Sequence, residues 1–173
     1  EPNVARYDLD LDKANAMLDE AGYARGADGM RFPLTIDFGW PSAKPMAEYI
    51  KPQLKKIGID VTVRTSAGFP AWAKTISTWD FDMTVDVVFN WGDPVIGVHR
   101  TYLCNNAKNG VIWSNTQQYC NPEVDAILAK AGQENDQQKR IALYSSAQKI
   151  IADDVPIYFT DTVPYHTIFN HTK

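Results

Sequence analysis

Apolar residues recur along the chain with two different periods, which predict strands and helices in alternation. A period of two marks residues 31–38 and 59–63 as strands. Between them, a helical stripe begins after Ser42 and consists of four apolar residues: Met46, Ile50, Leu54 and Ile57. Pro52 lies within this stripe and should kink the helix or remove one of its hydrogen bonds. A strand, a helix and a strand with a crossover of this length predict a right-handed parallel βαβ unit.

Two shorter helices are predicted on either side of this unit in the sequence. Asp10 is a typical capping residue for the first helix, and Gly22 is typical of a helix end. In the second amphipathic stretch, PAWAKTIST, the helical period brings Trp72 and Ile76 to one side. Strands and helices therefore alternate through the first half of the chain.

The next apolar segment, WDFDMTVDVVFNW, returns to a period of two and predicts a third strand. Its polar side carries Asp80, Asp82 and Asp86, which we interpret as a solvated or hinge-facing edge, with paired acid and base catalysis as the alternative. The strand leads directly into residues 89–94. In open α/β sheets ligands bind outside the carboxyl ends of strands, so these residues are well placed for a binding site.

The last third of the chain is predicted to be mostly helical. Asn121 and Pro122 are a typical start for a helix that should end at Gly132. Asp136 opens a longer helix whose apolar residues occur on two sides, so we expect this helix to be covered on more than one face. Residues 155–163 then predict a return strand.

Composition narrows the classes of function. The chain has 173 residues, of which 45% are hydrophobic, as one compact domain requires. Its net charge is -4 and its basic residues are scattered, which excludes a basic stripe for nucleic acid. No apolar run approaches the roughly 20 residues that cross a bilayer. The first residue is not Met, so we expect a mature form or an excised piece.

No catalytic or metal-binding motif is evident. GxSxG, HExxH, P-loop, GxGxxG and cysteine-nucleophile signatures are all missing from the sequence. His166 and His171 are five residues apart, which suits neither a helical nor a strand pair of metal ligands. We therefore expect a protein that is not an enzyme and has no catalytic residues, no metal site and no cofactor.

Cys104 and Cys120 flank a polar segment that resembles a long surface loop. A disulfide between them would stabilise the fold by roughly 3 kcal/mol in the chain-entropy model and would indicate an oxidising compartment. The alternative is two free thiols in a cytosolic protein.

Three aromatic residues lie where a ring could form the wall of a ligand pocket. Trp40, Trp91 and Tyr102 each fall just beyond a predicted strand or in a loop next to glycine or proline. We therefore include them among the candidate ligand-binding residues.

The order and spacing of several motifs resemble a known family. The motifs are GYARGADGMRFPLTIDF, QLKKIGIDVTV, WDFDM, WGDP, YCNPEVDAIL and KRIALYSSAQKIIADDVPIY. From Tyr7 to Tyr158 the sequence is similar to the second lobe of family five extracellular solute-binding proteins, the dipeptide-, oligopeptide- and nickel-binding components of bacterial ABC importers. The two cysteines also resemble the bridge of dipeptide-binding members.

The resemblance implies a fold and a setting. Residues 1–173 would form a single α/β lobe like those of periplasmic binding proteins, with a mixed, mostly parallel sheet flanked by helices. Such a lobe would be a fragment of a two-lobe protein in the periplasm or outside the cell, as a lipoprotein if the source is Gram-positive. It would capture a small solute, for example a peptide, against the first lobe and deliver it to a membrane permease.

The resemblance also implies a site. In peptide-binding members, a Trp and an Asp in the loop after the third strand hold the ligand backbone, and the carboxylate pairs with the ligand's α-amino group. Trp91 and Asp93 match this loop, together with Asn90 and Gly92. The family pattern separates Trp from the amine-binding Asp by two residues and places a second Asp before the proline. Here only Gly92 intervenes, so Asp93 corresponds either to the ligand-binding Asp or to the structural one.

Two other readings remain open at this level. A small secreted α/β hydrolase would use Asp93 with His99, provided that they are within hydrogen-bond reach. A non-catalytic interaction domain could share the same fold. For an isolated lobe we also expect self-association through the face that carries Trp91.

Overall fold

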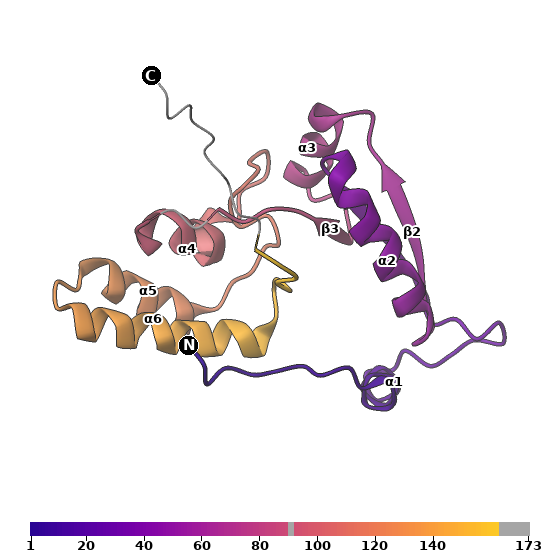
Figure 1. Ribbon diagram of the computed structural model, residues 1–173, viewed down its shortest axis with the longest axis horizontal. Helices are drawn as coiled ribbons and strands as arrows, with labels where there is room; N and C mark the ends of the chain where they lie inside the picture. The colour runs from indigo at the N-terminus through magenta and orange to yellow at the C-terminus, as the bar shows by residue number, and fades with distance from the viewer. Residues whose placement is uncertain (90–91, 163–173) are drawn as a thin grey trace, which may run out of the picture.

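The fold is that of a computed structural model, which describes residues 1–89 and 92–162. Asn90 and Trp91, predicted site residues, lie outside the described residues, as do His166 and His171. The helices and strands form two groups, one on each side of the segment that follows the third strand (Figure 1). In chain order they are α1 (Leu11–Glu20), β1 (Phe32–Phe38), α2 (Lys44–Lys55), β2 (Ile59–Thr65), α3 (Phe69–Ser77), β3 (Met83–Val85), α4 (Pro94–Tyr102), α5 (Pro122–Gln133) and α6 (Gln137–Asp154). Short 3-10 helices cover Pro41–Ala43 and Cys104–Asn106.

A small parallel sheet with the order β2-β1-β3 organises the first group. The predicted unit of β1, α2 and β2 is confirmed, with Ile36 opposite Val63. Ile36 of β1 and Ala47 of α2 are almost completely buried in the same apolar cluster, which joins the helix to the sheet. Pro52 lies inside α2, which continues to Lys55.

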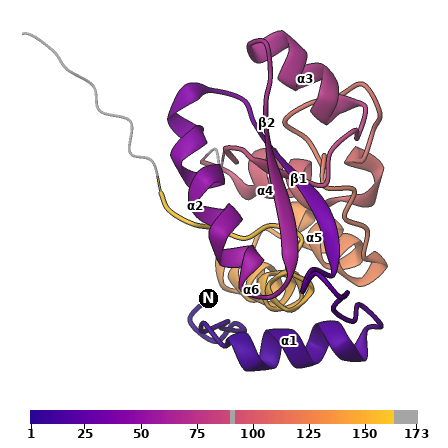
Figure 2. The same ribbon diagram turned by 90° about the vertical axis from the view of Figure 1, so that its right-hand side faces the viewer.

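The two shorter helices of this group lie at opposite ends of the sheet (Figure 2). Asp10 caps α1 as predicted, with its carboxylate accepting a hydrogen bond from the Lys13 amide at 2.8 Å. Gly22 follows α1 with φ +88°, a conformation that favours glycine. The prediction that Trp72 and Ile76 share one side of α3 is confirmed, because both residues are completely buried.

The predicted extents of two strands are wrong. β3 has only three residues, because its partner β1 ends at Phe38, directly opposite Val85. Beyond this point the following residues find no backbone groups of β1 to pair with. The predicted return strand is also not formed over its described residues, 155–162, where Tyr158 is 70% exposed.

An antiparallel pair of helices, α5 and α6, forms the base of the second group, and α4 packs on it (Figure 1). Asn121 and Asp136 cap α5 and α6 as predicted. The expectation that α6 is covered on more than one face is wrong in this chain, since Ala147 is its one buried residue and Ile141 is 51% exposed. Gly132 does not end α5 but lies within it.

The helix α4 was not predicted. Asp93 and Pro94 begin it in the same way as Asn121 and Pro122 begin α5, with a side-chain cap followed by proline. As a consequence Tyr102 is the last residue of a helix rather than a loop residue.

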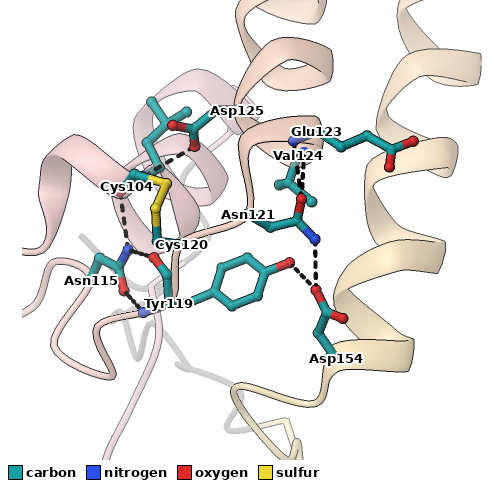
Figure 3. The surroundings of a disulfide bond; sticks show 10 residues. Cys104, Asn115, Tyr119, Cys120, Asn121, Glu123, Val124, Asp125 and Asp154 are labelled. Atoms are coloured by element: carbon teal, nitrogen blue, oxygen red, sulfur yellow. Dashed lines mark hydrogen bonds between the residues drawn. A yellow bond between two sulfur atoms is a disulfide. The ribbon is translucent and has the colours of Figure 1, made fainter.

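A disulfide joins Cys104 to Cys120, which confirms the prediction (Figure 3). The segment that it closes is ordered from within by Asn115, which is completely buried. The Asn115 amide donates to the carbonyls of Leu103 and Tyr119, and its oxygen accepts from the Tyr119 amide at 2.9 Å. The Tyr119 hydroxyl donates to Asp154 at 2.6 Å and so ties the loop to the end of α6.

Among the described residues, none of the helices has the length and apolar character needed to span a bilayer.

Candidate functional site

The carboxyl ends of β1 and β3 bring two predicted site segments to the same edge of the sheet. The two strands are parallel neighbours, and they end opposite each other at Phe38 and Val85. Trp40 follows β1 by two residues, and the segment 86–93 follows β3. Both segments therefore start side by side at the edge where open α/β sheets bind ligands.

Trp72 of α3 packs against this edge of the sheet and holds it in place. Its indole nitrogen donates to the hydroxyl of Thr84 in β3 at 3.2 Å. A Cβ atom at Gly39 would lie only 3.0 Å from the Trp72 ring, so this close approach requires glycine. Trp40 packs edge-on against Trp72 at a centroid distance of 5.7 Å and is partly exposed. Trp40 is thus held firmly while one part of its ring faces outward.

An ion pair between a buried carboxylate and a partly exposed guanidinium joins β1 to β2 near the same edge. Asp37 is 1% exposed, and its carboxylate accepts two hydrogen bonds from the Nε of Arg64 and one of 2.8 Å from Nη2. Arg64 also donates to the carbonyl of Asp80, just before β3. The polar side of β1 is therefore covered, and its charge is neutralised by β2.

The carboxylates around β3 have unequal surroundings. Asp80 and Asp82 are exposed, as expected for a solvated edge, and Asp82 accepts hydrogen bonds from the amide and the hydroxyl of Thr35 at 2.7 and 2.8 Å. Asp86 differs, because it is partly buried and accepts only the amide of Val87, at 2.7 Å. Burial raises the pKa of Asp86 to about 6.

Asp93 is engaged within the lobe itself. Its Oδ1 accepts a hydrogen bond from the Val95 amide at 2.9 Å, which caps α4. The same oxygen accepts a hydrogen bond from Nη2 of Arg140 on α6 at 2.7 Å. The Arg140 hydrogen bond, followed by that of Val95, lowers the pKa of Asp93. The sequence left two roles open for Asp93, ligand binding and support of the loop. This geometry matches the second role.

His99 has a different partner from the one that a hydrolase would need. Its Nε2 lies 3.0 Å from the hydroxyl of Tyr144, and the residue is 8% exposed. Burial lowers the pKa of His99. A Cβ at Gly132 would lie 3.1 Å from the His99 ring, which explains why glycine stands inside α5. No hydrogen bond joins Asp93 to His99 in the part of the chain that the structure describes, so the hydrolase reading is not favoured.

Tyr102 lies in the core rather than on a pocket wall. It is 6% exposed and packs edge-on against Tyr119 at a centroid distance of 6.0 Å. Burial raises its pKa to about 12. The burial argues for a supporting role beneath the site.

A cleft of about 610 Å³ opens beside β3. Residues 81–89 form one wall, and the others come from α2, α4, residues 113, 114 and 116–118 of the disulfide loop, which the Cys104–Cys120 bridge closes, and residues 155–158 and 160. Sequence reasoning missed this cleft because its walls are far apart in the chain and carry no shared motif. Within the described residues, no group of three His, Cys, Asp or Glu side chains could hold a metal ion.

The comparisons with known proteins agree with this architecture. Residues 1–109 match the family described as bacterial extracellular solute-binding proteins, family 5 Middle. The chain is similar to di/tripeptide-binding protein 3 of Pseudomonas aeruginosa, with 31% identity over 86% of this chain and 27% of that protein. It is also similar to the dipeptide-binding protein of Escherichia coli, with 26% identity over 99% of this chain and 31% of that protein.

Solved structures show the same fold. The periplasmic binding protein DppA of Helicobacter pylori, in complex with the peptide STSA, aligns with a TM-score of 0.77 and 30% identity over 89% of this chain and 29% of that one. NikZ of Campylobacter jejuni, in complex with Ni(L-His), aligns with a TM-score of 0.78 at 22% identity over 90% of this chain and 32% of that one, a likeness of fold alone. The chain thus spans less than a third of the length of these relatives.

Proposed function

Because this chain belongs to family 5 of the bacterial extracellular solute-binding proteins, we propose that it forms one lobe of a two-lobe protein that captures a small solute. The other lobe would close over the solute, and the loaded protein would deliver it to an ABC permease in the membrane. A peptide or peptide-like solute is favoured, because the relatives reported above are named for dipeptides and tripeptides and one was solved with a peptide. In this proposal residues 1–173 are a single lobe without catalytic function.

The observation that carries the proposal is the shared edge of β1 and β3. Trp40 and the segment that leads to residues 90–92 leave neighbouring parallel strands at that edge. We assign ligand contact to Trp40, Asn90, Trp91 and Gly92. We assign Asp93 to the support of this loop, since its Oδ1 caps α4 and binds Arg140.

The compartment follows from the family and from the disulfide. Family 5 members are extracellular solute-binding proteins, and the bridge between Cys104 and Cys120 fits an oxidising environment. We therefore place the protein in the periplasm or outside the cell.

Solute binding by the full-length gene product that contains this chain tests the proposal. Isothermal titration calorimetry with dipeptides and tripeptides should give reversible binding at one site. Trp91→Ala should weaken binding about tenfold or more, because an aromatic wall is typical of the residues that dominate an interface. Tyr49→Ala is the matched control, since Tyr49 is an aromatic residue 65% exposed on α2. Turnover of the peptide, or an unchanged affinity in Trp91→Ala, would contradict the proposal.

A further inference from the structure

The helix α4 begins directly after the ligand loop, which comprises residues 90–92 and to which we assign ligand contact. It packs on the pair of α5 and α6 (Figure 1). Asp93 is the N-cap of α4 and follows Gly92 without a gap. The position of α4 therefore sets the position at which the ligand loop ends.

Two side chains of α6, one helical turn apart, hold α4 at two points. Nη2 of Arg140 donates to Asp93 at the start of α4 at 2.7 Å. The hydroxyl of Tyr144 lies 3.0 Å from Nε2 of His99, which is nearly two turns further along α4. A helix that is held at two points can neither tilt nor slide freely against its neighbour. We call these four residues, Asp93, His99, Arg140 and Tyr144, the α4–α6 cluster.

The cluster is connected within itself and also involves α5. The Arg140 guanidinium lies over the Tyr144 ring, 5.6 Å from its centre, which is a cation–π distance. Nε of Arg140 donates to the Ala131 carbonyl of α5 at 3.2 Å. A Cβ at Gly132 would lie 3.1 Å from the His99 ring, so glycine allows the ring to reach this place. All three helices therefore meet at the cluster.

The cluster lies apart from the cleft beside β3. None of its four residues is among those that line the cleft. His99 is buried, and Tyr144 and Arg140 are partly buried against the neighbouring helices. An effect of Arg140 or Tyr144 on a solute in this cleft therefore has to pass through α4.

We propose that Arg140 and Tyr144 are positioning residues for solute binding, which hold the ligand loop in place through α4. A loop that is already held loses less conformational freedom when a ligand binds, and binding is tighter for that reason. The inference deepens the proposed function and rests on it for the role of the loop. It adds that solute affinity is controlled from a helix whose side chains do not line the cleft.

The first test measures solute affinity in the full-length gene product by calorimetry with dipeptides and tripeptides. Tyr144→Phe keeps the ring under Arg140 and removes only the hydroxyl, and Arg140→Met removes the contact with Asp93. Each should weaken binding roughly three- to tenfold. Lys139→Met is the matched control, because Lys139 is an exposed residue of α6 and its loss changes the net charge equally.

A double variant tests whether Arg140 acts through Asp93. If it does, Arg140→Met should weaken binding much less in an Asp93→Asn background than in the wild type, because the contact is already weakened there. Arg140→Lys should recover part of the affinity, since an ammonium group can still pair with the carboxylate. Full additivity of the two substitutions would contradict the proposed route.

The NMR signal of the Gly92 amide gives a second readout, measured on the 173-residue chain without solute. Tyr144→Phe and Arg140→Met should each shift and broaden this signal, whereas Lys139→Met should leave it in place. A cluster that only adds to overall stability would lower Tm without changing the Gly92 signal. That result would overturn the inference.

The charge of His99 should be coupled to the same contacts. The charged or titratable side chains that act on it are Asp93 of α4 and Arg140 and Tyr144 of α6, while α5 presents Gly132. Burial lowers the pKa of His99 below its ordinary value of about 6.5. Protonation would add a second cation near Arg140, so the intact cluster is favoured above about pH 6.5 and is weakened as the pH falls through the lowered pKa.

A pH titration of the chain from pH 7.5 to pH 5 measures this coupling. The Gly92 amide signal should move in step with the ring signal of His99, and this step should be lost in His99→Gln. Asp86 titrates in the same range, with a pKa of about 6. A step of equal size in His99→Gln would therefore belong to Asp86 and would contradict the coupling.

The two levels of the proposal fail in different ways. If Tyr144→Phe and Arg140→Met bind solute as tightly as the wild type, the inference is wrong even though the full-length protein binds peptides. If the full-length protein binds no solute at all, the proposed function is wrong, and the Gly92 signal still shows whether α6 holds the loop.

Discussion

The carboxylates near the strand ends carry charges that depend on their individual partners. Asp37 is buried but neutralised by Arg64, and Asp93 is held by Arg140 and by the first turn of α4. Asp86 has neither kind of support, and burial therefore raises its pKa whereas the partners of Asp93 lower its pKa. The same residue type thus stabilises packing in two places, whereas Asp86 has no ion pair among the residues that the structure describes.

The helix-capping role of Asp93 makes a prediction at the scale of one side chain. Asp93→Ala should lower Tm by roughly 2 to 4 °C, because α4 loses its cap and Arg140 loses its partner. Asp93→Asn should lower Tm less, since the amide oxygen still accepts the Val95 hydrogen bond. Thermal unfolding followed by circular dichroism measures both changes, with Asp60→Ala as the control.

The opposite pattern would assign Asp93 to the ligand. An unchanged Tm in Asp93→Ala, together with a large loss of peptide affinity when Asp93→Asn is made in the full-length protein, would show that the carboxylate serves the solute rather than the loop.

At the scale of elements, the disulfide loop connects α4 to α5 and contains the short 3-10 helix Cys104–Asn106 at its start. The bridge between Cys104 and Cys120 closes it, and the buried Asn115 provides the hydrogen bonds that a strand or helix would otherwise supply. The loop therefore has a defined structure, and its Trp113 lines the cleft.

Removal of the bridge should destabilise the chain. The double variant Cys104→Ser with Cys120→Ser should lose roughly 3 kcal/mol of unfolding free energy, because a closed loop of this size restricts the unfolded chain. Urea unfolding measures the loss, and a reducing agent should shift the wild type but leave the double variant unchanged. Equal urea midpoints for wild type and variant would show that Asn115 holds the loop without the bridge.

The elements differ in how far the sequence predicts them. The starts of α1, α5 and α6 were predictable, because a cap depends on a few neighbouring residues such as Asp10 and Asn121. The end of β3 was not predictable, because it is set by the end of its partner β1, where Phe38 lies opposite Val85, 47 residues later in the sequence. The Asp93–Pro94 start of α4 has the same signal as the start of α5, but the resemblance assigns these residues to a ligand-binding loop.

At the scale of the whole molecule, the candidate site lies between the two groups of elements. Asp86 at the carboxyl edge of the sheet and Trp113 of the disulfide loop both line the cleft, whereas Trp40 follows β1 at the same edge without lining it. No local pattern could predict this meeting, because the walls of the cleft come from segments as distant as residues 46 and 160. The resemblance to a family predicts a binding site at the carboxyl edge of the sheet, and the structure adds the cleft beside β3.

The surface beside the loop should make an isolated lobe self-associate. Val95 and Ile96 follow the predicted ligand loop directly and are 41% and 56% exposed. Sedimentation velocity should show a weight-average mass that rises with protein concentration, and Ile96→Ser should reduce the rise. Leu9→Ser is the control, because Leu9 is an exposed apolar residue at a distance in sequence from the loop. A strictly monomeric chain at high concentration would refute this expectation.

The single bridge also bears on how the protein matures after export. These 173 residues contain two cysteines, and both are in the bond between Cys104 and Cys120. Within these 173 residues one pair of cysteines allows one disulfide, so no alternative pairing inside this segment competes with it. An oxidising environment is what this segment needs to form its bond.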